Sequence, residues 1–204
     1  MLDKKQIEDW LLSMSISNYV INDDLSVDVD GAVDISHKRL TKIPVKFGNV
    51  SGDFSCSFNN LTSLEHCPTS VSGSFYCRNN NLTSLKHCPT SVGWSLYCYN
   101  NKLTSLEHCP SIISGSFYCH NNNLPSLEHC PTSVGGDFYC DGNDIVSLEH
   151  CPTSVGYYFY AGKIKVPCSP DVSKWLITKH EDLFNLIDNP SPDMVALNQM
   201  LWEI

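Results

Sequence analysis

Residues 77–97 read CRNNNLTSLKHCPTSVGWSLY, and this 21-residue pattern occurs five times without a break. The copies open at Cys56, Cys77, Cys98, Cys119 and Cys140. A fixed period predicts a solenoid, in which each unit stacks on its neighbours and makes the same contacts. A position that varies while its neighbours stay constant is then a candidate for specificity.

Each unit contains a short stretch in which apolar and polar residues alternate. Phe75 and Cys77 alternate with Tyr76 and Arg78, which is typical of a strand with one face turned inward. We predict two inward columns along the array. The first is aromatic, with Phe54, Phe75, Leu96, Phe117, Phe138 and Phe159, and the second contains the thiols of Cys56, Cys77, Cys98, Cys119 and Cys140.

The remainder of the unit predicts a polar turn and an extended return. Asn59, Asn80, Asn101, Asn122 and Asn143 follow the strands, where a buried carboxamide can bond backbone groups freed as the strand ends. The interior of the return is filled by Leu61/Leu64, Leu82/Leu85, Leu103/Leu106, Leu124/Leu127 and Ile145/Leu148, then by Cys67, Cys88, Cys109, Cys130 and Cys151. A proline follows each of these cysteines, which favours an extended return over a helix.

The repeat continues in weaker form at both ends. A degenerate leading turn is indicated by Val33, Ile35, Leu40 and Ile43. We expect a trailing turn to begin at Phe159 and Ala161 and then to decay, as Ile164 takes the asparagine slot and Val166 the leucine slot.

The ends of a solenoid expose its core and need caps. The segment Asp3–Met14 places Ile7, Trp10, Leu11 and Met14 on one helical face, and helix-start signals after Ser169 predict further helices to the C-terminus. We therefore expect an N-terminal helical cap and lead-in at 1–28, a solenoid at 29–166 and a C-terminal helical cap at 167–204.

The spacing Φ-x-Φ-x-x-Asn-x-Φ, in which Φ is apolar, resembles the leucine-rich repeat of the short bacterial type. The phrase LTSLEHCPTSVSGSFYC, preceded by DISHKRLTKIPVKFGNVSGDFSC, is most similar to leucine-rich-repeat proteins of tailed bacteriophages. The resemblance implies a leucine-rich-repeat solenoid of the α/β class, with short parallel strands and extended return segments. It implies little about activity, because such repeats are scaffolds for unrelated partners.

Composition narrows the range of partners. The formal net charge is −9, with 13 Lys and Arg against 22 Asp and Glu, which argues against nucleic acid and anionic membranes as partners. The first 15 residues lack the uninterrupted apolar run of a secretory signal, and no later stretch is long enough to span a bilayer. We expect a soluble protein in the cytoplasm of a bacterial host cell.

Two outward columns on the strands are the candidate site. The tyrosine column contains Tyr76, Tyr97, Tyr118, Tyr139 and Tyr160, with a spacing of about 4.8 Å expected between strands. The mixed column contains Ser57, Arg78, Tyr99, His120 and Asp141, in which every member differs. Stacked tyrosines could simply stabilise a sheet, whereas a varied column among constant neighbours favours recognition. Partner contacts are predicted at all five tyrosines of the tyrosine column and at Arg78, Tyr99, His120 and Asp141.

Two further columns allow a chemical interpretation. The row of His66, His87, His108, His129 and His150 could bind a transition metal or form a pH-sensitive edge, and the thiols could sense redox state or hold a cluster. We favour a solvated histidine edge and inert, reduced thiols. No cofactor, metal or catalytic residue is expected, because no nucleophile is evidently paired with His120 and Asp141.

Three functions follow as hypotheses. The first is a non-enzymatic bacteriophage accessory protein that covers a host protein, such as an immune protein, with its concave strand face. The second is a sponge that holds a nucleotide-like small molecule between tyrosines. The third is a structural or self-assembling component, with a homodimer as its simplest form.

Overall fold

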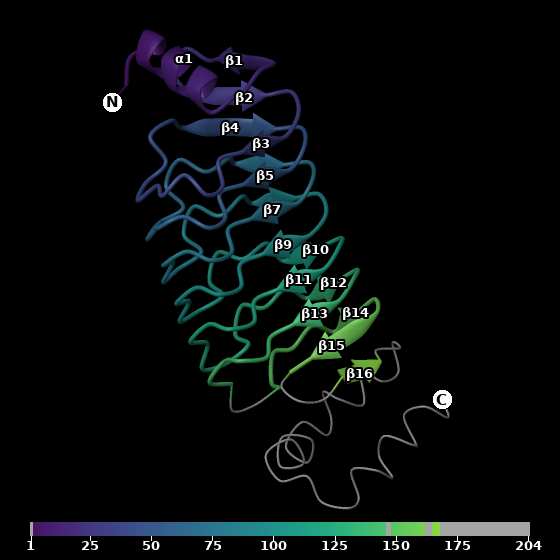
Figure 1. Ribbon diagram of the computed structural model, residues 1–204. Helices are drawn as coiled ribbons and strands as arrows, with labels where there is room; N and C mark the ends of the chain where they lie inside the picture. The colour runs from purple at the N-terminus through teal and green to yellow at the C-terminus, as the bar shows by residue number, and fades with distance from the viewer. Residues whose placement is uncertain (1, 146–147, 162–164, 168–204) are drawn as a thin grey trace, which may run out of the picture.

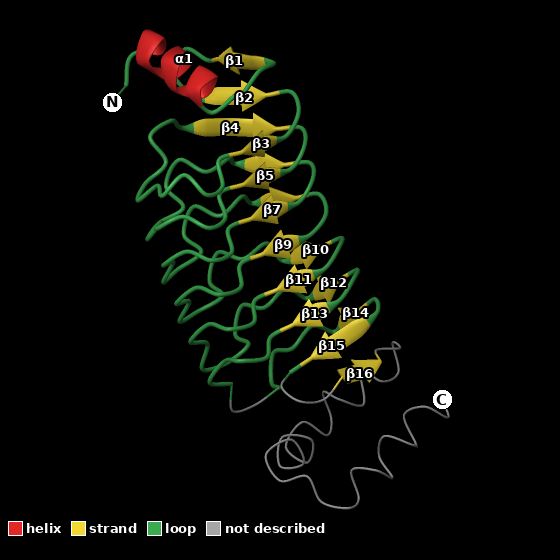
Figure 2. Ribbon diagram, in the orientation of Figure 1, coloured by secondary structure: helices red, strands yellow, loops and turns green. Residues whose placement is uncertain are grey.

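The chain folds into a β-solenoid of about six turns with a spacing of about 21 residues, as the repeat predicts. The computed structural model describes residues 2–145, 148–161 and 165–167. Figure 1 shows the turns stacked one below another from the N-terminal helix α1 (Lys4–Ser13), and Figure 2 shows that strands and loops form the stack. Within the described residues α1 is the one helix, so the prediction of extended return segments is confirmed there.

One sheet contains the predicted strands. Its order is β16-β15-β13-β11-β9-β7-β5-β3, and every pair from β3 to β15 is parallel. The bounds are β3 Val33–Asp34, β5 Phe54–Ser55, β7 Phe75–Tyr76, β9 Leu96–Tyr97, β11 Phe117–Tyr118, β13 Phe138–Tyr139, β15 Tyr158–Tyr160 and β16 Lys165–Pro167. Each residue pairs with its equivalent 21 positions along, as Phe75 does with Leu96. We call the outward side of this sheet the strand face.

A second set of strands runs along the return side and was not predicted. The bounds are β1 Tyr19–Ile21, β2 Val27–Val29, β4 Phe47–Val50, β6 Ser70–Val71, β8 Ser91–Val92, β10 Ile112–Ile113, β12 Ser133–Val134 and β14 Ser154–Val155. They form a sheet of order β1-β2-β4-β6-β8 and another of order β10-β12-β14. The inward valine of each Ser-Val pair is buried, and only three residues separate such a pair from the next strand of the first sheet, so these strands bound the core beside the strand face.

The core is a stack of equivalent side chains. Phe54 and Phe75 stack with ring centroids 5.8 Å apart, and Phe117, Phe138 and Phe159 continue the column at 5.5 and 5.1 Å. The paired leucines and the first thiol column are almost fully buried, as predicted. No disulfide joins the ten described cysteines. Burial raises the pKa of the Cys98 thiol to about 12, so this thiol is protonated at neutral pH and packs as a small apolar group.

The predicted asparagine ladder is present beneath the strand face. Asn80 Nδ2 donates to the carbonyl oxygens of Cys77 (3.1 Å) and of Cys56 in the preceding turn (3.0 Å). Its Oδ1 accepts from the backbone N–H of Leu61 at 3.0 Å. The same pattern recurs at Asn59, Asn101, Asn122 and Asn143. Each carboxamide thus ties two turns together where the strand ends.

The N-terminal end joins the solenoid through more than a helix. Asp3 and Gln6 form a capping box that begins α1, and Ile7 and Leu11 are buried in the common core. Strands β1 and β2 form an antiparallel pair, and β2 also pairs with β4 in parallel. This hairpin lies within the segment expected only as a lead-in.

At the other end, the prediction that Val166 continues a trailing turn is wrong. Phe159 does begin such a turn, because it pairs with Phe138 in parallel. Strand β16, however, turns back and pairs antiparallel with β15, in the register Phe159↔Val166. An antiparallel strand uses the hydrogen-bonding edge of β15 that the next turn of the array would otherwise use. The predicted C-terminal cap at 167–204 lies, apart from Pro167, outside the described residues.

Candidate functional site

The tyrosine column is a continuous stack of rings on the strand face. The centroid distances are 4.5 Å for Tyr76–Tyr97, 4.8 Å for Tyr97–Tyr118, 4.8 Å for Tyr118–Tyr139 and 4.0 Å for Tyr139–Tyr160. Each ring is half-buried by its neighbours. Partial burial raises the pKa values of the Tyr97 and Tyr139 hydroxyls, which therefore stay protonated at physiological pH. The column is first of all a set of cross-strand contacts that stabilise the sheet.

The mixed column lies beside the tyrosine column, as predicted, and its members contact one another. Arg78 Nη1 donates a hydrogen bond to the Tyr99 hydroxyl. Tyr99 stacks on His120 with centroids 4.3 Å apart. The imidazole of His120 also lies 6.2 Å from the Tyr118 ring and 6.1 Å from the Tyr139 ring. Desolvation lowers the pKa of His120, although the nearby carboxylate of Asp141 opposes this shift.

The mixed column also carries polar atoms that have no partner. Among the described residues, the buried side-chain nitrogen and oxygen atoms without a hydrogen bond are Ser57 Oγ, Arg78 Nε and His120 Nδ1. All three belong to this one column. A buried polar atom without a partner costs free energy, so its presence needs an explanation in a native structure.

The polar column that flanks the tyrosines on their other side has a structural role instead. Each of its side chains accepts a hydrogen bond from the backbone N–H of the equivalent residue in the next turn: Asp53 from Ser74 (2.7 Å), Ser74 from Ser95 (3.3 Å), Ser95 from Ser116 (2.9 Å), Ser116 from Asp137 (2.9 Å) and Asp137 from Tyr158 (3.1 Å). Its acceptors are therefore already used. This leaves the mixed column as the more distinctive part of the strand face.

Sequence reasoning missed the residues that follow the mixed column. His37, Phe58, Asn79, Asn100 and Asn121 all have positive φ, between 52° and 57°. The asparagines form a second, exposed ladder in which Asn100 Nδ2 bonds Asn79 Oδ1 at 3.0 Å. A signal was available, because the slot holds Asn three times and then Gly142, the residues that tolerate this conformation best.

Phe58 is the exception in that slot. Its backbone φ is 55°, a conformation that disfavours an aromatic side chain. The residue is 40% exposed. It stacks on His37 with centroids 4.4 Å apart, and the guanidinium of Arg78 lies 5.3 Å from its ring centroid. Phe58 and His37 thereby extend the mixed column toward the N-terminus.

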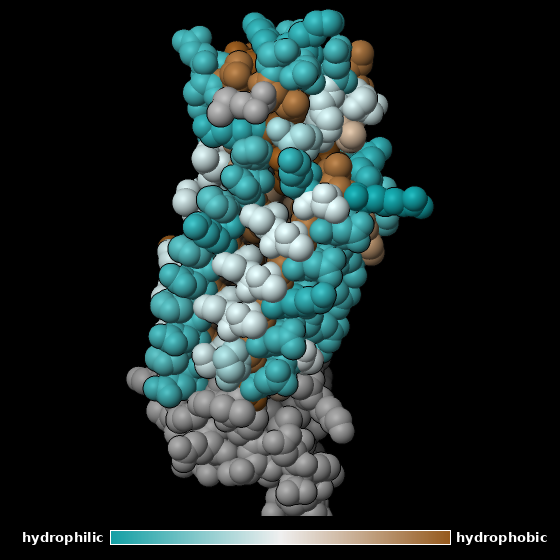
Figure 3. Space-filling model, turned by 90° about the vertical axis from the view of Figure 1, so that its left-hand side faces the viewer, coloured by the Kyte–Doolittle hydropathy of each residue, from teal (hydrophilic) through white to brown (hydrophobic). Residues whose placement is uncertain are grey.

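The histidine row lies at a turn on the loop side. His66, His87, His108, His129 and His150 have φ between 64° and 71°. In each turn the N–H of the next residue bonds back, as Cys88 N does to Leu85 O at 2.8 Å. Within the described chain, no group of three or more His, Cys, Asp or Glu side chains is placed to hold a metal ion. The loop side is mostly hydrophilic below the N-terminal end (Figure 3).

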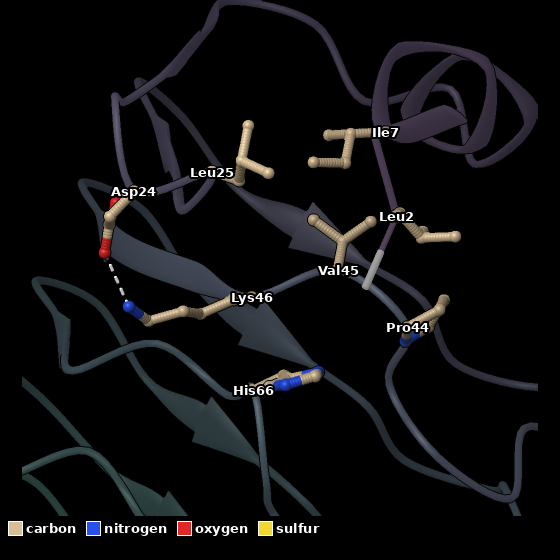
Figure 4. Close-up of a pocket in the computed structure, with 8 residues that line it drawn as sticks. All are labelled: Leu2, Ile7, Asp24, Leu25, Pro44, Val45, Lys46 and His66. Carbon is tan, nitrogen blue, oxygen red and sulfur yellow. Dashed lines mark hydrogen bonds and ion pairs between the residues drawn. The ribbon is translucent and has the colours of Figure 1, made fainter. Parts of the chain in front are cut away.

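A small cavity of about 170 Å³ lies beneath α1 (Figure 4). Its walls are mostly apolar, and its lining residues are Leu2, Ile7, Asp24, Leu25, Pro44, Val45, Lys46 and His66. The two charged residues pair with each other, since Lys46 Nζ lies 2.6 Å from Asp24 Oδ2. The hydrogen bond from Lys46 lowers the pKa of Asp24. His66 Nδ1 lies 2.8 Å from the carbonyl oxygen of Ile43. The cavity thus offers a ligand little unpaired polar chemistry.

Two further apolar side chains are exposed, Trp94 between β8 and β9 and Ile112 on β10. Trp94 is 61% exposed and occupies a slot that holds Gly73, Gly115 and Gly136 in other turns. Ile112 is 62% exposed and replaces a serine of the neighbouring turns. Neither residue lies in the tyrosine column or the mixed column. A substitution at either one can therefore serve as a control for substitutions on the strand face.

The geometry therefore brings the predicted residues together on one face. No helix in the described part of the chain combines the length and apolar character that crossing a bilayer requires. No family model, curated protein or solved structure matches this chain.

Proposed function

We propose that this chain is a non-enzymatic protein-binding module that recognises its partner through the strand face. The observation that carries the proposal is the set of buried, unpartnered polar atoms of Ser57, Arg78 and His120, which all lie in the mixed column. Aromatic and arginine side chains held in place by stacking are the composition of binding hot spots. Preorganised rings lose little conformational entropy on binding.

The kind of partner rests on resemblance. The repeat resembles leucine-rich repeats of bacteriophage proteins, and on that basis we propose a host protein as the partner, which the module inhibits or redirects inside the bacterial cell. An immune protein of the host is the specific form of this proposal. The helix α1 and the segment 167–204 are proposed as the caps of the array.

A small-molecule sponge is supported less well. The tyrosine rings stack 4.0 to 4.8 Å apart, so a ligand ring cannot lie between them unless two turns of the solenoid separate. Separation would also break the asparagine ladder that joins the turns. Thermal-shift screening against nucleotides and sugars tests this alternative.

The experiment for the leading proposal is capture from a bacterial host lysate with the full chain as bait. We expect one protein at a stoichiometric level, and its loss when Tyr97, Tyr99 and Tyr118 are changed to alanine. A second variant, Arg78→Ala with Tyr99→Ala and His120→Ala, changes the mixed column alone, whereas the first variant changes both columns. Circular dichroism must show that each variant is folded.

Trp94→Ser is the matched control, because it removes an exposed aromatic side chain away from the strand face. Capture should survive this change. Loss of the partner with Trp94→Ser and its retention by both strand-face variants would place the interface at the β8–β9 corner and refute the proposal.

A further inference from the structure

Arg78 is a cation on the strand face that lies close to two aromatic rings. Its Cζ lies 5.3 Å from the ring centroid of Phe58 and 5.4 Å from that of Tyr99, so the guanidinium is held between aromatic side chains of adjacent turns. One of its five N–H donors, on Nη1, is used by the Tyr99 hydroxyl. Nε has no partner within the described chain.

Arg78 also lacks a counterion. Within the described residues, no carboxylate lies within ion-pair distance of it, although the chain carries a net charge of −9. The chain has many carboxylates that could pair with an arginine. The absence of one beside Arg78 therefore results from the side chains that the fold places around it. Ser57, in the preceding turn of the mixed column, is 2% exposed and its hydroxyl is also unpartnered. The Ser57 hydroxyl and the Arg78 Nε–H group, in adjacent turns, thus both lack a hydrogen-bond partner within the described residues.

The backbone at Phe58 supports a specific role for this arrangement. The left-handed conformation suits the Asn and Gly residues of the equivalent slots, and a phenyl side chain is sterically disfavoured there. The phenyl ring is nevertheless the group that contacts the Arg78 guanidinium. A strained residue that positions a functional group is a recurrent feature of binding sites.

We propose that Arg78 is an oxyanion-binding residue, and that its ligand is a carboxylate or phosphate group carried by the protein partner. The rings of Phe58 and Tyr99 hold the planar guanidinium while the remaining N–H groups of its two Nη atoms bind two oxygens of one anion, a geometry that arginine provides and lysine does not. The ligand class follows from the site alone, and only its attachment to a protein rests on the proposed function.

The test uses the two arginines of the chain, Arg39 and Arg78, which should give two Nε–Hε signals in an ¹⁵N–¹H correlation spectrum. The full chain is titrated with sodium phosphate, with sodium acetate and with sodium chloride at matched ionic strength. We expect the Arg78 signal to move saturably with an oxyanion, with a dissociation constant on the order of 10 mM, and to ignore chloride. Arg39 is exposed and serves as the internal reference.

The arms of the titration also identify the source of the anion. Saturation by phosphate alone assigns a phosphorylated partner, and saturation by acetate assigns an acidic side chain. The variant Phe58→Leu keeps an apolar side chain and should weaken either interaction about threefold through loss of the cation–π contact. If the Arg78 signal moves no more than that of Arg39 in both oxyanions, the proposal is overturned. That result leaves lysate capture through the other residues of the strand face intact, so the two proposals fail independently.

Discussion

The tyrosine column and the mixed column run side by side on the same strands but differ in how their side chains are satisfied. In the tyrosine column one residue type repeats, and every ring contacts its neighbours at 4.0 to 4.8 Å. In the mixed column residue type changes at each turn, and Arg78 and His120 keep unpartnered polar atoms. Uniformity therefore accompanies regular ring stacking, and variation accompanies buried polar atoms that have no hydrogen-bond partner within the described residues.

A change beneath both columns should have the largest effect, because it removes their common support. Asn101→Ala deletes the acceptor for Leu82 N–H and the donors to the carbonyl oxygens of Cys77 and Cys98. We expect the free energy of unfolding to fall by about 3 kcal/mol, measured by urea denaturation. Asn143→Ala is the control: its side chain is only partly buried, so a smaller loss is expected. Equal losses of unfolding free energy in the two variants would show that the burial of the asparagine side chain does not determine the size of the loss.

Within the strand face, the tyrosine column should carry more of the stability. Tyr97→Ala removes two stacking contacts, with Tyr76 and Tyr118, and should cost about 2 kcal/mol in equilibrium unfolding. Tyr99→Ala removes one stack, on His120, and should cost about half as much. A loss at Tyr99 that equals the loss at Tyr97 would remove the distinction between the columns.

Arg78→Gln should change stability less again. Within the described residues the guanidinium has no ion pair and contributes cation–π contacts and a hydrogen bond to the Tyr99 hydroxyl, so we expect a loss below about 1 kcal/mol by thermal or chemical denaturation. Arg39→Gln, at an exposed site, is the reference for a change that touches no column. A loss well above that limit at Arg78 would make the residue a structural one.

The smallest effect should be the pH dependence contributed by His120. Burial lowers its pKa in the folded state, so the unfolded state binds the proton more tightly, and stability falls as pH falls through about 6.5. His120→Tyr keeps a ring on Tyr99 without the titration. The difference in unfolding free energy, His120→Tyr minus the unmodified chain, should therefore increase as the pH is lowered from about 7 to about 5. A difference that stays constant over this range would contradict the assigned cause.

The repeat predicted most of this arrangement because its period fixes which residues become neighbours. The aromatic and thiol columns, the asparagine ladder and the outward position of Tyr97 and Tyr99 all follow from one alternation repeated along the chain. What the pattern could not supply was the conformation of residues that depart from it. Phe58 occupies a slot that holds asparagine in the next three turns, and its contact with Arg78 depends on a left-handed backbone that its residue type disfavours.

The ends and the return side were harder to predict for a related reason. A Ser-Val pair is too short to be recognised as a strand, and β6 forms one only because β4 and β8 lie on either side of it. Likewise, Val166 fits the leucine slot by spacing, yet its segment pairs antiparallel with β15. Within the described residues no further unit follows β15 to impose the repeat, and the segment pairs locally instead.

The central claim is that the mixed column recognises and the tyrosine column stabilises. Its most direct test is to measure, for Arg78→Ala, Tyr99→Ala, His120→Ala, Tyr97→Ala and Tyr118→Ala, both the affinity for the captured partner and the free energy of unfolding. We predict affinity losses of at least about tenfold for the first three, with smaller losses of stability than for the last two. Affinity losses that follow the stability losses, regardless of column, would contradict the account.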